Sequence, residues 1–277
     1  MINIRQALDQ GLQLVANTEA ALEAEILLTY VLEKNRAYLY AHPERTLTPE
    51  QEKKYLDCLN KRVLGTPIAY ITGTREFWSL NLKVSPATLI PRHETEQLVE
   101  LTLELAPHQD TVNVLDLGTG SGAIALALAK ERPHWQIDAC DLSADALAIA
   151  QDNAKIHDLK NVNFYQSNWF SNLPAKKYHA IVANPPYIAP GDPHLQEGDL
   201  RFEPINALVS ADQGLADIQV ISKQSKNFLF EGGFLLLEHG FEQKVQIIAI
   251  LDRLGYRVQC WQDLQGHDRV TGGWNGG

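Results

Sequence analysis

Cysteine and long apolar runs are scarce in this chain of 277 residues. Its three cysteines, Cys58, Cys140 and Cys260, lie far apart in the sequence, and no CxxC pair accompanies them. This spacing argues against a disulfide framework and a metal site, so we expect no metal and a reducing, cytoplasmic environment. No apolar run is long enough to cross a bilayer, and the first residues lack the charged leader and apolar core of a signal peptide. We therefore expect no membrane association.

Positive charge is also in short supply. The chain has 24 lysines and arginines against 34 aspartates and glutamates, which gives a net charge of −10. This balance repels polyphosphate and argues against broad, sequence-independent binding of nucleic acid. With 45% hydrophobic and 21% charged residues, the composition is typical of a globular protein of one or two domains. We expect it to be monomeric.

The first seventy residues carry helical signals and no strand alternation. Apolar residues recur near helical spacing between positions 20 and 31. Thr48-Pro49-Glu50-Gln51 is a capping-box sequence, in which Thr48 caps the helix and Pro49 takes its first position. Gly65 suits the end of that helix. Residues 1–72 are therefore predicted to form a small helical domain.

The pattern changes after this domain. Leu80, Leu82 and Val84 alternate with polar residues, as in a half-buried strand. We predict that residues 73–93 form a linking hairpin.

Strands and helices alternate in residues 94–277, which predicts a parallel sheet with crossover helices. A loop of about twenty-five residues after position 183 is too long for a plain connection, and its length favours a functional role. A turn is expected at Gly232-Gly233. The expected helices are 95–105, 123–130, 144–157, 216–227 and one ending at 254, and the expected strands are 112–117, 137–141, 162–166, 180–183, 234–237 and two near 258 and 270.

Three glycines stand where the strand ending at Leu117 turns into a helix. Gly118, Gly120 and Gly122 let a ligand approach the backbone and the helix N-terminus, with Thr119 and Ser121 between them. The glycines alone also fit a dinucleotide fingerprint, so they do not identify the ligand.

Two carboxylates narrow the choice of ligand. Asp116 precedes the first glycine by two residues, where it would repel a pyrophosphate but suit the ammonium group of a methionine-like ligand. Asp141 closes the second strand, where an acidic residue binds ribose hydroxyls. Together they predict a site for S-adenosylmethionine. The alternative is that the glycines make only a tight turn and Asp141 caps the next helix.

Asn168 and Trp169 follow the third strand, where an adenine ring would lie. Asn168 offers an acceptor to the adenine amino group, and Trp169 offers a face for the ring. The alternative for Trp169 is a place in the hydrophobic core.

The tetrapeptide Asn184-Pro185-Pro186-Tyr187 follows the fourth strand. The two prolines stiffen the backbone. The side-chain oxygen of Asn184 and the carbonyl of Pro185 can accept hydrogen bonds from an NH2 group on a planar substrate, and Tyr187 can cover that group. An amide or exocyclic amino nitrogen is a poor nucleophile unless it is held in this way, so the motif indicates methyl transfer to such a nitrogen. The alternative is that the prolines merely end the strand.

The chain resembles the release-factor glutamine methyltransferases, the PrmC or HemK family. Besides the glycine turn and Asn184 to Tyr187, the resemblance rests on five segments: Pro67 to Gly73, Glu76-Phe77-Trp78, Leu89-Ile90-Pro91-Arg92, Arg201-Phe202-Glu203-Pro204 and Glu238-His239-Gly240. It implies a Rossmann-like class I methyltransferase fold, α/β, with a seven-stranded, mostly parallel sheet.

The resemblance also implies a reaction. This is methylation of the glutamine in the Gly-Gly-Gln motif of peptide-chain release factors, with S-adenosylmethionine as cofactor and the helical domain helping to hold the release factor. The implied cofactor site includes Gly118 to Gly122, Asp141, Trp169 and Asn184, and the glutamine would lie at Asn184, Pro185, Pro186 and Tyr187. The chain departs from the family pattern at His93, at Asn168, where aspartate is frequent, and at Gly272-Gly273-Trp274.

Two other functions stay open at this point. A DNA adenine amino-methyltransferase solves the same chemical problem with the same tetrapeptide, but it needs a basic face and a base-flipping element. A non-catalytic adapter would keep the fold and lose the cofactor site. A histidine general base at His239 is less favoured than a structural place for that residue at a strand end.

Overall fold

The computed structural model describes residues 1–15, 19–109 and 111–276. The chain divides into two compact units. Unit 1 contains Met1–Thr74 and Gln196–Phe202, and unit 2 contains Arg75–Leu195 and Glu203–Gly277. In residues 1–15, 19–109 and 111–276, no helix is long and apolar enough to span a membrane.

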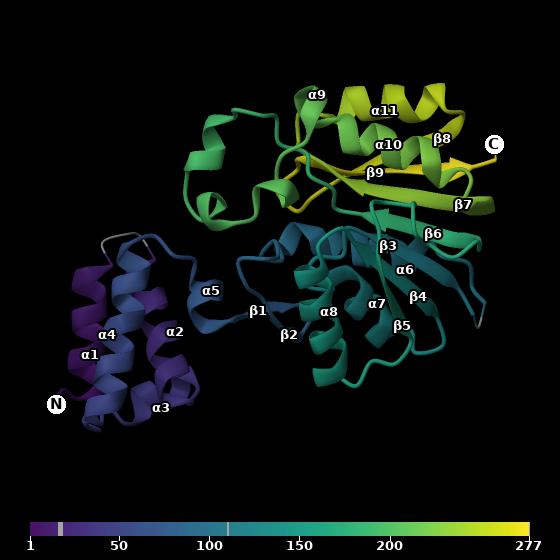
Figure 1. Ribbon diagram of the computed structural model, residues 1–277. Helices are drawn as coiled ribbons and strands as arrows, with labels where there is room; N and C mark the ends of the chain where they lie inside the picture. Colours follow the sequence, from purple (N-terminus) through teal and green to yellow (C-terminus); the bar gives the residue numbers. More distant parts are fainter. Residues whose placement is uncertain (16–18, 110, 277) are drawn as a thin grey trace. The chain divides into compact units, whose positions relative to one another are not determined.

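The described residues of unit 1 form five α-helices and the short 3-10 helix Leu200–Phe202 (Figure 1). The predicted capping box is present, since Gln51 N donates to Thr48 Oγ1 at 3.2 Å and Thr48 N donates to Gln51 Oε1 at 3.0 Å. Ile4, Leu27 and Tyr55 lie in a hydrophobic core between the helices. The helices are α1 (Ile4–Leu14), α2 (Ala20–Leu32), α3 (Arg36–Ala41), α4 (Pro49–Val63) and α5 (Ile68–Thr72).

A short piece of the long loop, Gln196–Phe202, belongs to unit 1 although it lies far along the chain. Arg62 of α4 pairs with Glu23 at 2.7 Å and with Asp199 of this segment at 3.4 Å. A Cβ atom at Gly65 would come within 2.0 Å of the Arg201 guanidinium. The absence of a side chain at Gly65 thus leaves room for the returning segment.

Unit 2 is centred on a seven-stranded sheet of order β5-β4-β3-β6-β7-β9-β8. The first five strands in that order are parallel, and β9 is antiparallel to both of its neighbours. The prediction of a mostly parallel, seven-stranded sheet is confirmed. The strands are β3 (Asn113–Leu117), β4 (Gln136–Asp141), β5 (Val162–Gln166), β6 (Tyr178–Ala183), β7 (Leu229–Glu238), β8 (Tyr256–Gln262) and β9 (Asp268–Asn275).

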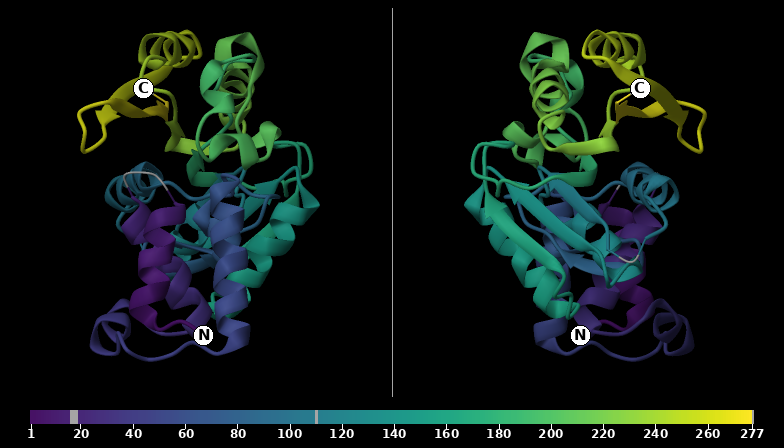
Figure 2. Two further views of the ribbon diagram at one scale, coloured as in Figure 1. Left: turned by 90° about the vertical axis from the view of Figure 1, so that its left-hand side faces the viewer. Right: turned by 90° about the vertical axis from the view of Figure 1, so that its right-hand side faces the viewer.

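Helices cover both faces of this sheet (Figures 1 and 2). One face packs against α6 (Glu96–Leu105), α7 (Ala123–Glu131) and α8 (Ala144–Ile156), and the other packs against α10 (Ala216–Ser225) and α11 (Lys244–Arg253). Side chains alternate between the faces, so that Val114 meets the first group while Leu115 and Leu117 meet the second. The apolar strands are buried on both sides, as in other parallel sheets.

The predicted hairpin is present as β1 (Thr74–Phe77) and β2 (Leu80–Lys83). Its turn residues Trp78 and Ser79 have φ angles of 50° and 56°. The hairpin side chains Phe77, Leu80 and Leu82 belong to the same hydrophobic core as side chains of α6 and α7.

The turn expected at Gly232-Gly233 is wrong. Strand β7 runs through both glycines, and four residues of β7 lie between Leu229 and Phe234, whose partners on β6, Tyr178 and Ala180, have only one residue between them. Gly232 takes a φ of 76° there. Glycines that resemble a turn signal in the sequence therefore accommodate an irregularity inside a strand.

The long loop after β6 contains a β-bridge between Ile188 and Val209 and short turns of helix. These are η2 (Pro193–Gln196), η3 (Leu200–Phe202), η4 (Ile205–Ala207) and α9 (Ala211–Gly214), while η1 (His93–Thr95) precedes α6.

Candidate active site

A cavity in unit 2 lies at the carboxyl ends of β3, β4, β5 and β6, where ligands bind in open α/β sheets. It brings together nine of the residues predicted from the sequence to form the site. These are Gly118, Thr119, Gly120, Ser121, Asp141, Asn168, Trp169, Asn184 and Pro186. The predicted residues Asp116, Gly122, Pro185 and Tyr187 do not line it.

The glycine turn after β3 is fixed by backbone hydrogen bonds. The N–H groups of Gly118 and Thr119 both donate to the Cys140 carbonyl at 2.9 Å. Gly120 has a φ of 57°, and no described atom outside its immediate neighbours lies within 4 Å of where its Cβ would be. The turn therefore needs glycine for its left-handed backbone and leaves open space above it.

Asp141 holds this turn from the next strand. Its Oδ2 accepts from Gly120 N at 2.9 Å and its Oδ1 from Ser143 N at 2.9 Å. Burial raises the pKa of the carboxyl, and the backbone hydrogen bonds oppose that rise. Each carboxylate oxygen has a further lone pair, so Asp141 can hold the turn and accept from a ligand at once.

Asp116 lies behind the turn. Its side chain is fully buried, and Oδ2 accepts from Thr119 Oγ1 at 2.6 Å and from Ala125 N at 3.2 Å. Its Oδ1 has no hydrogen-bond partner among the described residues. Burial raises the pKa of this carboxyl to about 7. The side chain thus ties the turn to the start of α7, and its direct contact with a ligand ammonium stays a prediction.

Asn168 and Trp169 line the cavity after β5. Trp169 is only partly buried, and its indole N–H donates to Asp217 Oδ1 at 3.1 Å. A Cβ at Gly118 would lie 3.4 Å from the Trp169 ring. The indole therefore stands beside the glycine turn and presents part of its surface to the cavity.

The tetrapeptide continues from β6. Asn184 and Pro186 line the cavity, and Asn184 Nδ2 donates to Thr95 Oγ1 at 3.1 Å. This hydrogen bond leaves the Asn184 side-chain oxygen available as an acceptor. Pro185 is buried, and Tyr187 lies behind the cavity wall with its hydroxyl 3.5 Å from Glu238 Oε1.

Side chains from distant segments brace the tetrapeptide. Gln243 Nε2 donates to the Tyr187 carbonyl at 3.0 Å, while Gln243 Oε1 accepts from Gly240 N at 2.9 Å. A Cβ at Gly214 would meet the Tyr187 carbonyl oxygen at 2.0 Å. The backbone of Tyr187 is therefore held between Gly214, at the end of α9, and Gln243, which precedes α11.

Sequence reasoning assigned no role to Glu203 and Arg92, although both lie in segments that carry the family resemblance. In the structure the two side chains form an ion pair, and Glu203 Oε2 also accepts from Ile90 N at 3.0 Å. This pairing holds the end of the long loop beside Pro91 and Pro204, which both line the cavity. The sequence signal for Glu203 and Arg92 is their place in the segments Arg201-Phe202-Glu203-Pro204 and Leu89-Ile90-Pro91-Arg92.

The structure places His239 directly after β7, as expected. It is fully buried, with Nε2 2.8 Å from Thr271 Oγ1 and Nδ1 2.9 Å from the Gly240 carbonyl. Burial lowers its pKa, which favours the neutral ring. These hydrogen-bond partners indicate a structural role for His239. In the ranges that the structure covers, no group of three or more potential ligand side chains is placed to hold a metal ion.

The cavity wall carries negative charge. Its described lining includes Asp141 and Asp217 and no lysine, arginine or histidine. A pyrophosphate bound beside these carboxylates would be repelled, while a ligand with ammonium and sulfonium groups would be attracted. The charge of the wall therefore disfavours the dinucleotide alternative.

Comparisons with known proteins agree with this geometry. Residues 94–197 match the model of the methyltransferase small domain, and residues 6–73 match the PrmC N-terminal domain. The release factor glutamine methyltransferase of Coxiella burnetii is 49% identical over 98% of this chain and 98% of its own length. The one from Escherichia coli is 49% identical over 97% of this chain and 96% of its own. This chain belongs to the release factor glutamine methyltransferases.

Solved structures with low identity share its fold. A methyltransferase from Pyrococcus furiosus has a TM-score of 0.54 at 15% identity, covering 83% of this chain and 100% of that one. The Thermus thermophilus 16S rRNA N2 G1207 methyltransferase in complex with AdoMet and guanosine also has a TM-score of 0.54, at 16% identity, covering 73% of this chain and 49% of that one. The class I methyltransferase fold is confirmed.

The enzyme takes its methyl group from S-adenosylmethionine, and the residues of the cavity fit this cofactor. Asp141 offers acceptors to ribose hydroxyls, Gly120 leaves open space over the turn, and the acidic wall suits a cationic ligand. The unpaired Oδ1 of Asp116 adds a buried acceptor behind the turn.

Proposed function

We propose that this enzyme methylates the side-chain amide nitrogen of the glutamine in the Gly-Gly-Gln motif of peptide-chain release factors. The observation that carries the proposal is the hydrogen bond from Asn184 Nδ2 to Thr95 Oγ1, at 3.1 Å. This hydrogen bond engages the nitrogen of the Asn184 amide and leaves the side-chain oxygen free. Because Asn184 lines the cavity, that oxygen can accept from an NH2 group of the substrate.

In the proposed reaction, Asn184 Oδ1 and the Pro185 carbonyl accept the two hydrogens of the glutamine NH2 group. Pro185 and Pro186 restrict the backbone, so these acceptors lose little conformational freedom on binding. We assign Tyr187 to the same catalytic group as these two acceptors. Its hydroxyl lies close to Glu238, and its carbonyl accepts a hydrogen bond from Gln243. Such positioning can supply about 7 to 11 kcal/mol of the barrier in favourable cases.

S-adenosylmethionine supplies a methyl group bound to a positively charged sulfur. We propose that Gly118, Thr119, Gly120, Ser121 and Gly122 form its backbone cradle, and that Asp141 binds the ribose. The proposal also places Asn168 and Trp169 at the adenine, Asn184 beside the methyl group and Asp116 near the amino acid end. As the new N–C bond forms, one amide proton leaves to an acceptor or to water.

We further propose a division of labour along the chain. Residues 1–72 recognise the release factor, residues 73–93 link, and residues 94–277 carry the methyltransferase site. The helical unit has a hydrophobic core of its own, which supports a separate role. We propose that the enzyme has no nucleic-acid specificity, because its net charge is −10. We also propose that it is a monomer and that it acts in the cytoplasm, where its substrate, a translation factor, works.

Mass spectrometry of the tryptic release-factor peptide that contains Gly-Gly-Gln tests the proposal. Incubation with the enzyme and S-adenosylmethionine is expected to add one methyl group to the glutamine. Asn184→Ala should lower kcat about 100-fold or more, a loss typical of removing one preorganised hydrogen-bonding group. Asn275→Ala is the matched control, because that amide bonds Phe230 O away from the cavity. Methylation of duplex DNA in place of the release factor would contradict the proposal.

A further inference from the structure

Four side chains from three segments of unit 2 form a connected row beside the cavity. Asn184 follows β6 and donates from Nδ2 to Thr95 Oγ1 at 3.1 Å. The Thr95 hydroxyl also interacts with the carboxylate of Glu238, at the end of β7. The Tyr187 hydroxyl lies 3.5 Å from Oε1 of the same carboxylate. Asn184 and Thr95 line the cavity, while Glu238 is buried behind them.

The chemistry of these groups gives the row a direction. A threonine hydroxyl has one hydrogen, and an ionised carboxylate only accepts hydrogen bonds. When Thr95 gives its hydrogen to Glu238, its oxygen can only accept from Asn184. The Asn184 amide must then present Nδ2 to Thr95 and leave Oδ1 free. A flipped amide would place two acceptor oxygens opposite each other, with no hydrogen between them.

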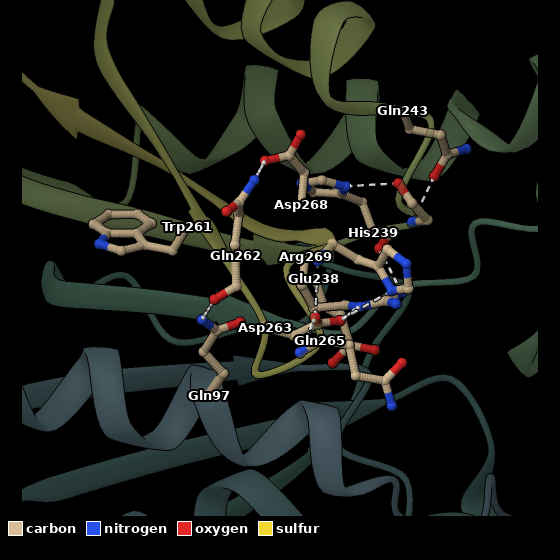
Figure 3. A network of polar contacts seen from close by, with 12 residues as sticks. Gln97, Glu238, His239, Gln243, Trp261, Gln262, Asp263, Gln265, Asp268 and Arg269 are labelled. Carbon is tan, nitrogen blue, oxygen red and sulfur yellow. Dashed lines mark hydrogen bonds and ion pairs between the residues drawn. The ribbon is translucent and has the colours of Figure 1, made fainter.

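Glu238 is built into the fold as a buried acceptor. Its side chain is 1% exposed, and Oε2 has no hydrogen-bond partner in the described part of the chain. The charged and titratable groups that act on it are Arg269, Glu94 and the Tyr187 hydroxyl. Arg269 is itself held, with Nε 3.2 Å from Asp263 Oδ2 and Nη1 donating to the His239 carbonyl at 3.2 Å (Figure 3). The positive charge of Arg269 therefore offsets only part of the rise that burial causes in the pKa of Glu238.

We propose that Glu238 and Thr95 are positioning residues, which set the amide orientation of Asn184 so that its oxygen, and not its nitrogen, meets the substrate NH2 group. The inference rests on the proposed function, because it assigns the substrate hydrogen bond to Asn184. It adds a reason for the buried acid at the end of β7, which touches neither the cavity nor the reacting atoms.

Protonation of Glu238 reverses the row. A neutral carboxyl group can donate to Thr95 Oγ1, and the Thr95 hydroxyl can then donate to Asn184 Oδ1. The amide would turn its NH2 group toward the substrate NH2 group, where two donors face each other. Burial, the largest cause, raises the pKa of Glu238 to about 7, so this reversal falls within a measurable pH range.

Four variants test the inference. Thr95→Val removes the hydroxyl with little change of shape, Thr95→Ser restores it, and Glu238→Gln removes the charge. Thr102→Val is the matched control, because Thr102 is buried in α6, the helix that follows Thr95, and its hydroxyl donates to the Leu98 carbonyl, at 2.6 Å, within that helix. The measurements are kcat and KM on the release factor, the affinity for S-adenosylhomocysteine by calorimetry, and the pH profile of kcat.

Thr95→Val and Glu238→Gln are expected to lower kcat about tenfold or more, as a misplaced substrate group does. Thr95→Ser should return kcat to within about threefold of the original enzyme, and the S-adenosylhomocysteine affinity should change less than about threefold in all variants. The original enzyme should gain activity as the pH rises through about 7, while Glu238→Gln should lack that step. Wild-type kcat in both Thr95→Val and Glu238→Gln would overturn the inference.

A second readout separates this inference from the proposed function. The side-chain NH2 resonances of Asn184, assigned by their loss in Asn184→Ala, should move in Thr95→Val and Glu238→Gln and stay in place in Thr102→Val. If the unmodified enzyme fails to methylate the release factor, the proposed function fails, and these resonances still decide whether Glu238 and Thr95 orient the amide. Unchanged resonances in both variants would reject the positioning role.

Discussion

Two strands of the central sheet carry a buried carboxylate behind the cavity wall, Asp116 near the end of β3 and Glu238 at the end of β7. In both cases a threonine hydroxyl meets the carboxylate and burial raises its pKa to about 7. The difference lies in what the threonine holds. Thr119 belongs to the glycine turn itself, while Thr95 passes the interaction on to the Asn184 side chain. One acid thus fixes a backbone, and the other fixes a side-chain orientation.

Two similarly buried acids can therefore have different roles. Asp116 supports the turn that binds the cofactor, and Glu238 supports the side chain that positions the substrate. A backbone turn has one shape that a ligand needs, so its loss should affect stability and cofactor affinity. A side-chain amide has two orientations of similar shape but opposite hydrogen-bonding character. Loss of the group that selects between them should affect kcat at nearly constant cofactor affinity.

Removal of Asp116 should produce the largest effect on stability. Asp116→Ala leaves the Ala125 N–H and the Thr119 hydroxyl without their acceptor, and a buried unpaired donor costs about 1–3 kcal/mol. We expect the free energy of unfolding, measured by urea denaturation, to fall by about 3 kcal/mol. Thr119→Val, which removes only one of the two hydrogen bonds, should cost about 1 kcal/mol. Equal losses in the two variants would show that Asp116 does not join the turn to α7.

The pH dependence of stability should be the next largest effect. Because the folded-state pKa of Glu238 is about 7, above its ordinary value, the folded protein keeps a proton that the unfolded chain releases. The stabilising contribution is present at low pH and is lost as the pH rises toward 7. Between pH 5 and pH 8, the unfolding free energy should fall by about 2–3 kcal/mol more in the original protein than in Glu238→Gln. Parallel stability curves for the two proteins would argue against a raised pKa.

Trp169→Phe should have the smallest effect. Phenylalanine keeps an aromatic ring beside Gly118 but loses the hydrogen bond from the indole N–H to Asp217. We expect S-adenosylhomocysteine affinity, measured by calorimetry, to fall about threefold, or about 0.7 kcal/mol. Trp135→Phe serves as control, because Trp135 lies in the core away from the cavity. A tenfold loss of affinity would mean that the hydrogen bond of the indole N–H to Asp217 contributes more to cofactor binding than we expect.

Local sequence patterns predicted most of the elements and the glycine turn. The capping box at Thr48 and the strand that ends at Asp141 depend on neighbours within a few residues, so they can be read directly from the sequence. In the sequence, Gly232-Gly233 resembles a turn signal. In the structure, these glycines lie in an irregularity of strand β7 that arises where β7 pairs with β6. Only the sheet could reveal it.

The bracing of the site depends on longer distances along the chain. Thr95 and Asn184 are 89 residues apart, and Arg92 and Glu203 are 111 apart. No periodicity or spacing rule links such residues, and each has a plausible surface role in the sequence. The residues that touch a ligand could thus be predicted, whereas those that orient them required the fold.

The second segment of unit 1 has a consequence for the inheritance of this architecture. Because Gln196–Phe202 packs with the helices of Met1–Thr74, and Arg62 pairs with Asp199, the unit is not one continuous stretch of gene. A single recombination event after residue 74 would transfer the helices without the segment they pack against. Exchange of the helical unit between relatives would therefore require either two matched replacements or a compatible loop already present in the recipient.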